Sequence, residues 1–135
     1  MSEPMVGGVM PYLTVVGGVR AIEFYRQAFE AVEFARHMAD DGVRVLNSHL
    51  GINGGSIMLS DHFREFHGDA SAPPPAGVVL HLQVDDADAW FARALDAGCT
   101  EIMPLGDQFW GDRYGRVKDP FGHTWSIAHT LAQAG

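Results

Sequence analysis

Pro11-Tyr-Leu-Thr-Val-Val16 precedes the segment Ala21-Ile-Glu-Phe-Tyr-Arg-Gln-Ala-Phe-Glu-Ala31. Later in the chain the same pattern recurs, where Leu80-His-Leu-Gln-Val84 precedes Asp88-Ala-Trp-Phe-Ala-Arg-Ala-Leu-Asp-Ala97. In both places a short run of alternating apolar and polar residues precedes a segment whose apolar residues recur at helical spacing. Glycine-rich turns and further alternating runs come next. An internal repeat of this kind predicts two copies of a strand–helix–strand–strand–strand unit, with a cleft between or beside two sheets.

Alternation and turn residues divide each copy into expected elements. The first copy has a helix over 20–30 and strands over 9–16, 32–38, 43–50 and 55–60. The second has an apolar helical stripe from Ala87 to Leu95 and strands over 78–84, 99–104, 113–118 and 123–129. Residues 61–77 are polar and rich in proline, which predicts a stiff linker. The expected organisation is a single domain, 1–135, whose modules 9–60 and 78–129 are joined by that linker.

The composition limits the class of partner. Apolar residues make up 47% of the 135 residues, enough for a core, and the net charge is −8. That charge argues against nucleic acid and against an anionic membrane surface, and it fits a neutral or cationic small ligand better. Cys99 is the only cysteine and is expected to be a buried, inert thiol. No leader-like or membrane-spanning run is visible, so the cytoplasm is the expected location.

The segment Val117-Lys-Asp-Pro-Phe-Gly-His-Thr-Trp-Ser-Ile127 resembles the last hairpin of the vicinal oxygen chelate superfamily, which includes glyoxalase I, bleomycin-resistance proteins and extradiol dioxygenases. Asp107-Gln-Phe-Trp-Gly-Asp-Arg-Tyr-Gly115 resembles its PhnB-like branch, often described as 3-demethylubiquinone methyltransferase-like. The resemblance implies an α+β fold of two βαβββ modules, glyoxalase/bleomycin-resistance-like, whose curved mixed sheets form a cleft. It also implies a homodimer, because paired modules in this superfamily commonly complete their clefts across a subunit contact.

The same resemblance implies where a metal would be held. Catalytic members use ligands from the first and last strands of each module, and at those positions this sequence has Met10, Met58, Val79 and Ser126. A thioether, an isopropyl group and a hydroxyl do not replace the carboxylate or imidazole donors that divalent cations need. We therefore expect no metal. We also expect no cofactor, because no Gly-x-Gly-x-x-Gly motif follows a strand.

Strand alternation assigns side chains to the expected cleft. The inward-facing candidates for ligand binding are Tyr12, Met58, His81, Gln83 and Ser126. Two interpretations of His81 stay open: it contacts a ligand, or its nitrogens are satisfied by neighbours such as Gln83 or a serine. No partner for acid–base catalysis is visible, so the catalytic residues are unknown. Tyr12 and His81 occupy equivalent first-strand positions of the two modules, and we expect both to contact a ligand.

Three further groups are candidates for ligand binding. Asn47 and His49 share one face of a strand and either line the cleft or lie half-exposed. Trp110 either stacks on a flat ligand or packs over the open end of the sheet. Arg113 either binds an anionic group or pairs with a nearby aspartate, such as Asp107, or with a partner subunit.

The expected function is binding of an unidentified small molecule by a metal-independent protein of the glyoxalase/bleomycin-resistance type. The rival is an enzyme of the same superfamily, lyase-like or dioxygenase-like, that uses a displaced metal site or no metal. A third alternative is a structural or partner-binding dimer without a small ligand. The replaced ligand positions favour the binding protein over a metalloenzyme.

Overall fold

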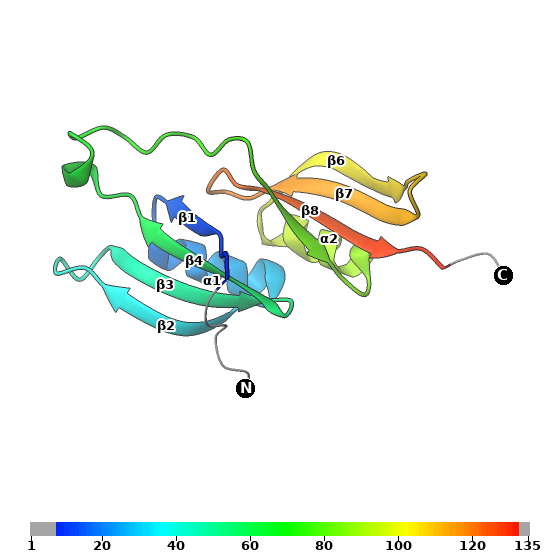
Figure 1. Ribbon diagram of the computed structural model, residues 1–135, viewed down its shortest axis with the longest axis horizontal. Helices are drawn as coiled ribbons and strands as arrows, with labels where there is room; N and C mark the ends of the chain where they lie inside the picture. The colour runs from blue at the N-terminus through cyan, green and yellow to red at the C-terminus, as the bar shows by residue number, and fades with distance from the viewer. Residues whose placement is uncertain (1–7, 133–135) are drawn as a thin grey trace. The chain divides into compact units, whose positions relative to one another are not determined.

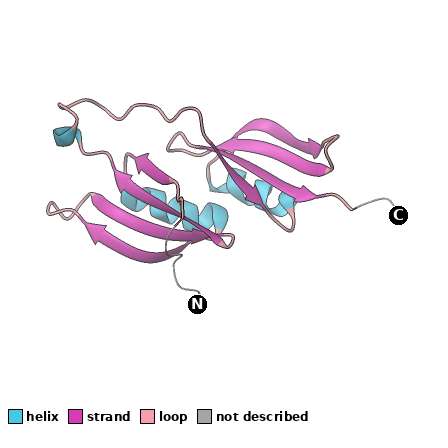
Figure 2. Ribbon diagram, viewed as in Figure 1, coloured by secondary structure: helices cyan, strands magenta, loops and turns pink. Residues whose placement is uncertain are grey.

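The structure, a computed structural model, describes residues 8–132. The chain divides between Pro73 and Pro74 into two compact units. Each unit contains one four-stranded sheet and one α-helix (Figure 1). Both units have the element order strand–helix–strand–strand–strand (Figure 2). The repeat and the α+β class predicted from the sequence are therefore confirmed.

The first unit starts with β1 (Tyr12–Val15) and α1 (Gly18–Phe29) and continues with β2 (Val32–Met38), β3 (Val45–Ile52), β4 (Gly55–Asp61) and the short 3-10 helix η1 (Arg64–Phe66). The sheet order is β1-β4-β3-β2; β1 is parallel to β4, and the other pairs are antiparallel. α1 covers one face of the sheet and contacts β3 and β4. The largest side chains buried in this unit are Val15, Ile22, Tyr25, Phe29, Val45, Leu50 and Leu59.

The second unit repeats this arrangement with β5 (Val79–Gln83), α2 (Ala87–Ala97), β6 (Thr100–Asp107), β7 (Asp112–Lys118) and β8 (Thr124–Thr130). The sheet order is β5-β8-β7-β6, again with the first and last strands parallel. α2 packs on β6, β7 and β8, and the core includes Leu80, Leu82, Phe91, Val117, Trp125 and Ile127. Within residues 8–132, no helix has the length and apolar character needed to cross a membrane.

Several strand boundaries differ from those expected, and three of them have a clear local reason. β1 begins only after Pro11, which has no N–H with which to extend a strand ladder. β3 begins at Val45, because the Asp41 carboxylate accepts the backbone N–H groups of the two preceding residues and holds them in a turn. β6 continues past Pro104 to Asp107, because it is an edge strand with a register shift there, and edge strands tolerate proline.

A buried aspartate holds the entry to α1. Asp61, at the end of β4, is only 7% exposed. Its Oδ1 accepts the N–H groups of Gly17 and Gly18 at 2.8 and 2.9 Å, and its Oδ2 accepts the N–H of Val45 at 2.8 Å. One carboxylate therefore joins the β1–α1 turn to the start of β3. It lies in the segment expected to be linker, yet it is part of the first sheet.

A second buried aspartate organises the turn between β7 and β8. Asp119, 3% exposed, accepts the N–H groups of Phe121 and His123 on Oδ1 at 2.9 and 3.0 Å. Its Oδ2 accepts the indole N–H of Trp125 at 2.9 Å. The Asp-Pro-x-Gly turn quoted above is thus tied to the largest side chain of the core.

Cys99 is buried just before β6, at 8% exposure. Burial, together with the nearby Asp119 carboxylate, raises the pKa of its thiol to about 12. The thiol is therefore protonated at neutral pH and a poor nucleophile, as predicted.

Candidate functional site

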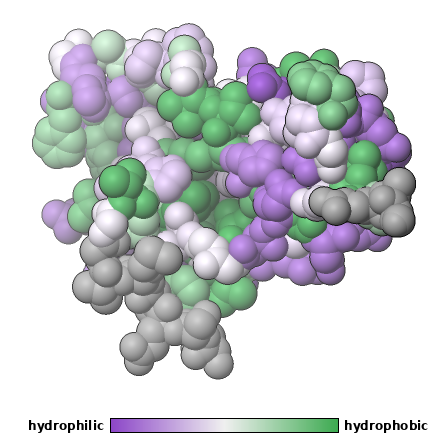
Figure 3. Space-filling model, turned by 45° about the vertical axis from the view of Figure 1, so that its right-hand side comes forward, coloured by the Kyte–Doolittle hydropathy of each residue, from purple (hydrophilic) through white to green (hydrophobic). Residues whose placement is uncertain are grey.

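Each sheet has one face covered by its helix and one open face. In β1, Leu13 and Val15 are buried, and in β5, Leu80 and Leu82 are buried, while the residues between them are exposed. The predicted alternation of faces is therefore confirmed in both units. Figure 3 shows hydrophobic and hydrophilic residues intermingled on the visible surface. The candidate binding residues on the strands lie on these open faces, except Arg113, which lies on the face of β7 that α2 covers.

The strand register gives the two open faces equivalent positions. Tyr12 of β1 is paired with Met58 of β4, and His81 of β5 is paired with Ser126 of β8. Both pairs join the first strand of a unit to its last strand. Tyr12 and His81 are therefore equivalent within their own units, as predicted, and so are Met58 and Ser126.

His81 is held by side chains on the open face of the second sheet. Its Nδ1 lies 2.7 Å from the Ser126 Oγ, and its Nε2 lies 2.8 Å from the Gln83 Oε1. The Gln83 Nε2 donates to the Thr130 Oγ1 at 3.2 Å. Because an amide oxygen only accepts, the His81 Nε2 donates and its Nδ1 accepts the Ser126 hydroxyl proton. The structure thus agrees with the second interpretation of His81, in which neighbouring side chains satisfy both ring nitrogens.

Two residues that the sequence reasoning missed complete this face: Tyr114 and Arg116 of β7. The Tyr114 ring stacks on the His81 ring, with centroids 6.1 Å apart, and meets the Trp110 ring edge-on at 5.5 Å. Arg116 donates from Nε to the Tyr114 hydroxyl at 2.9 Å and is paired across the sheet with Ser126. Trp110 packs over the sheet yet stays 48% exposed. Alternation along β7 would have found both residues, since it places them on one face.

Arg113, by contrast, is engaged by carboxylates. Its Nε and Nη2 donate to the two oxygens of Asp88, and its Nη1 donates to Asp107, each at 3.0 Å. The hydrogen bond from Arg113 lowers the pKa of Asp88 and raises that of the guanidinium itself. The aspartate pairing predicted as one alternative is therefore found, with Asp88 as a partner that the sequence did not suggest.

Four candidates share the open face of the first sheet. Asn47 donates from Nδ2 to the Tyr12 hydroxyl at 2.8 Å. His49 is paired with Met58 across β3 and β4. The His49 ring meets the Phe34 ring edge-on at 5.4 Å, and its Nε2 is buried without a hydrogen-bond partner among residues 8–132. Asn47 and His49 are both half-buried, so they belong to the surface of this face rather than to the core.

The positions that would hold a metal in related enzymes carry poor donors. Met58 offers a thioether, and the Ser126 hydroxyl is buried and hydrogen-bonded to His81. Met10 and Val79 lie two residues before Tyr12 and His81 along the chain; Met10 precedes β1, and its sulfur accepts a hydrogen bond from Ser56 at 3.2 Å. These residues do not fit a divalent cation, which needs carboxylate, carbonyl or imidazole ligands.

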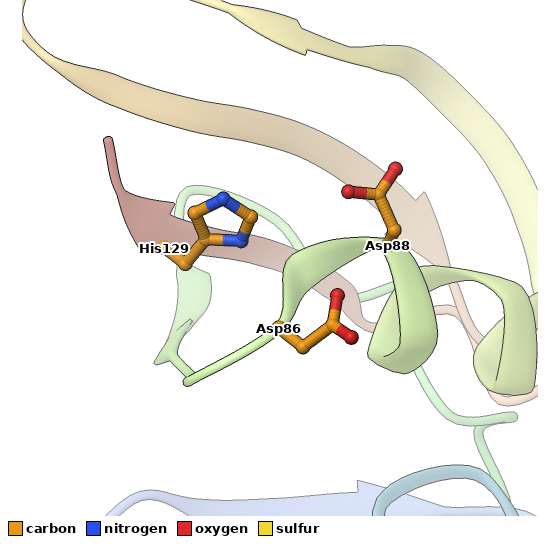
Figure 4. Close-up of side chains that lie close together, drawn as sticks. All are labelled: Asp86, Asp88 and His129. Carbon is orange, nitrogen blue, oxygen red and sulfur yellow. The ribbon is translucent and has the colours of Figure 1, made fainter. Parts of the chain in front are cut away.

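One group of metal-type side chains does occur among residues 8–132, at the start of α2. Potential ligand atoms of Asp86, Asp88 and His129 lie within 4.8 Å of one another (Figure 4). Each side chain already makes a structural contact. Asp86 caps the helix by accepting the Ala89 N–H, and His129 Nδ1 accepts the Ala87 N–H. Asp88 forms an ion pair with Arg113. Helix capping and an ion pair therefore explain this group, and we assign no metal to it.

Comparison with known proteins identifies one family for this chain. The family model described as Glyoxalase/Bleomycin resistance protein/Dioxygenase superfamily matches residues 13–127. An uncharacterized protein from Mycobacterium bovis is 44% identical over 127 residues, covering 91% of this chain and 83% of that protein.

Solved structures agree with the fold. The crystal structure of a gene product from Arabidopsis thaliana is 29% identical, with a TM-score of 0.71 over 92% of this chain and 99% of that one. A PhnB protein from Bacillus cereus has a TM-score of 0.64 over 93% of this chain and 100% of that one, at 19% identity. At that identity, the second likeness concerns the fold alone.

Proposed function

Because the chain belongs to the glyoxalase/bleomycin resistance protein/dioxygenase superfamily, we propose that it binds a small organic molecule on its open sheet faces without the help of a metal. The observation that carries this proposal is the chemistry of the second open face. Hydrogen-bonding groups of His81, Gln83 and Arg116 lie there beside the half-buried ring of Tyr114 and the exposed ring of Trp110. Aromatic walls with a few oriented polar groups are the usual composition of a small-molecule site.

The donor-poor metal positions support a binding protein over a metalloenzyme. A thioether at Met58 and a buried, hydrogen-bonded hydroxyl at Ser126 leave no ligand set for Lewis-acid chemistry there. The hydrogen-bond partners of His81 are a buried serine and a neutral amide, so neither partner is a carboxylate that would stabilise the imidazolium that a general base would form. We place the chain in the PhnB-like branch on the motif from Asp107 to Gly115, and we keep the cytoplasm as its expected location.

The test is a thermal-shift screen of small aromatic compounds, in the presence and absence of EDTA, followed by calorimetry of the hits. A ligand that binds only the folded state raises Tm, and we expect the same shift with EDTA. His81→Ala removes the ring that stacks on Tyr114 and the partner that orients Gln83. Tyr12→Ala removes an exposed ring and the acceptor of Asn47. Each substitution should weaken binding by about 1–2 kcal/mol. His67→Ala, an exposed histidine in the turn after η1 and outside both sheets, is the matched control and should have no effect. Binding that needs added divalent metal, or that survives both substitutions unchanged, would contradict the proposal.

We also propose a homodimer, since closed two-fold dimers are the commonest soluble oligomers and an incomplete binding face gains walls from a partner. Static light scattering at micromolar concentration should give about twice the chain mass of 14.7 kDa. A stable monomer over the same concentration range would contradict this proposal and leave the ligand-binding proposal standing.

A further inference from the structure

We propose that Arg116 forms an anion subsite on the open face of the second sheet, and that the ligand is a flat aromatic compound with an acidic group. The inference deepens the proposed function and rests on it. It replaces the neutral or cationic ligand suggested by the net charge of −8. Four observations carry it: the free donors of Arg116, its orientation, the charges around it and the neighbouring rings.

The first observation is the state of the guanidinium. Arg116 is half-buried, and its Nε donates to the Tyr114 hydroxyl. Among residues 8–132, its Nη1 and Nη2 have neither a hydrogen-bond acceptor nor a carboxylate within salt-bridge distance. Arg113 on the same strand is the opposite case, because all three of its nitrogens donate to Asp88 or Asp107. A partly buried cation that lacks an anionic partner favours a ligand that supplies one.

The second observation is that the Arg116 fork is oriented. The hydrogen bond to Tyr114 uses Nε, so the paired Nη groups remain for a ligand. The guanidinium also lies 5.8 Å from the Tyr114 ring centroid, which adds a cation–π contact. A planar fork held in this way suits an acidic group that accepts hydrogen bonds on two oxygens, such as a carboxylate, sulfonate or phosphate.

The third observation is the local charge. Alternation along β7 places Asp112, Arg116 and Lys118 on the open face. Lys118 is two residues from Arg116, whereas Asp112 is four residues away, about 13 Å along a strand. The residues paired beside Arg116 on the neighbouring strands, Ser126 and Met103, are neutral. The surroundings of Arg116 are therefore positive although the whole chain is acidic.

The fourth observation is the pair of rings beside the fork. Tyr114 stacks with His81 at an interplanar angle of 18°, and Trp110 stands at 76° to Tyr114. Trp110 is 48% exposed, so part of its ring is available to a flat ligand. Rings next to a guanidinium match a molecule in which an aromatic system carries the acidic group.

The experiment compares three probes of one shape: 2-naphthoate, which is anionic; 2-naphthamide, which is neutral; and 2-naphthylmethylamine, which is cationic. Titrations are followed by ¹H–¹⁵N NMR of the arginine Nε–H and tryptophan indole groups. We expect 2-naphthoate to bind about tenfold more tightly than 2-naphthamide, with the cation weakest, because a hydrogen bond to a charged group is stronger than a neutral one. 2-Naphthoate should shift the Arg116 Nε and Trp110 signals and leave the Arg113 Nε signal in place, an internal control.

Variants then assign the preference to Arg116. Arg116→Gln should abolish the tenfold preference for 2-naphthoate, and Arg116→Lys, which keeps the charge but not the fork, should retain part of it. Arg26→Gln, an exposed position on α1, removes the same charge and should retain all of it. Equal binding of 2-naphthoate and 2-naphthamide to the native protein would overturn the anion subsite and leave the binding function intact. If no probe shifts a signal from the open face, both proposals are overturned.

Discussion

Asp61→Ala is expected to lower the free energy of unfolding by about 3–5 kcal/mol, the sum of several lost charge-assisted hydrogen bonds and of the N–H groups left unsatisfied in a buried site. The carboxylate accepts three backbone N–H groups, and no neighbouring side chain of the turn replaces it. The carboxylate lies so close to the turn that a Cβ at position 18 would be 2.6 Å from the Asp61 Oδ2, so this contact also restricts position 18 to glycine. The measurement is urea unfolding followed by far-UV circular dichroism, which reports both units.

Asp40→Ala is the matched control, since this exposed aspartate in the β2–β3 turn should change stability by no more than about 0.5 kcal/mol. Asp61→Asn is a second variant: its amide oxygen still accepts the N–H groups of Gly17 and Gly18, but its NH₂ group faces the N–H of Val45, so we expect an intermediate loss of stability. An Asp61→Ala protein as stable as the Asp40→Ala protein would show that the turn does not depend on this carboxylate.

Asp119→Ala is expected to destabilise the second unit by about 3 kcal/mol, because it removes the acceptor of two backbone N–H groups in the β7–β8 turn and the partner of a buried indole. Trp90, Trp110 and Trp125 all lie in this unit, so tryptophan fluorescence follows its unfolding. A lower midpoint in urea with an unchanged slope is the expected result.

The control for this prediction is Asp96→Asn, an exposed position on α2 that should leave the midpoint within experimental scatter. Trp125→Phe removes the indole donor but keeps an aromatic core residue. If the Asp119 to Trp125 bond contributes as proposed, the double variant Asp119→Ala, Trp125→Phe should lose less than the two single losses added together. Strict additivity would contradict a direct coupling between these side chains.

The strand and helix pattern was largely readable from the sequence because it depends on local periodicity. Alternation placed Tyr12 and His81 on open faces, and the register of their strands agrees. Asp86, directly before α2, caps the helix by accepting the Ala89 N–H, as aspartate commonly does at this position. Such features need only neighbouring residues and the preferred geometry of a strand or a helix start. The ends of strands were less certain, because turn residues such as Asp41 and Pro104 act on them individually.

The candidate site shows where local pattern stops being informative. The sequence left open whether Arg113 binds an anionic group or pairs with a nearby aspartate, and it did not suggest Asp88, the partner 25 residues away along the chain. The sequence did not indicate Arg116 as a binding residue, although its Nη donors have no partner within residues 8–132. Which of two nearby arginines meets a carboxylate depends on how α2 packs against β7, and this is a property of the packed unit.

By itself, the sequence determined the two repeated modules, their order of elements, the faces of their strands and the poor donors at the metal positions, because periodicity and side-chain chemistry are local. Only the tertiary structure decided how the polar residues are partnered. It placed Asp61 beneath the β1–α1 turn and brought the His81 nitrogens to Ser126 and Gln83. It also left the Arg116 fork open. Hydrogen bonds and ion pairs are short-ranged and directional, so their partners are fixed only when distant segments pack together.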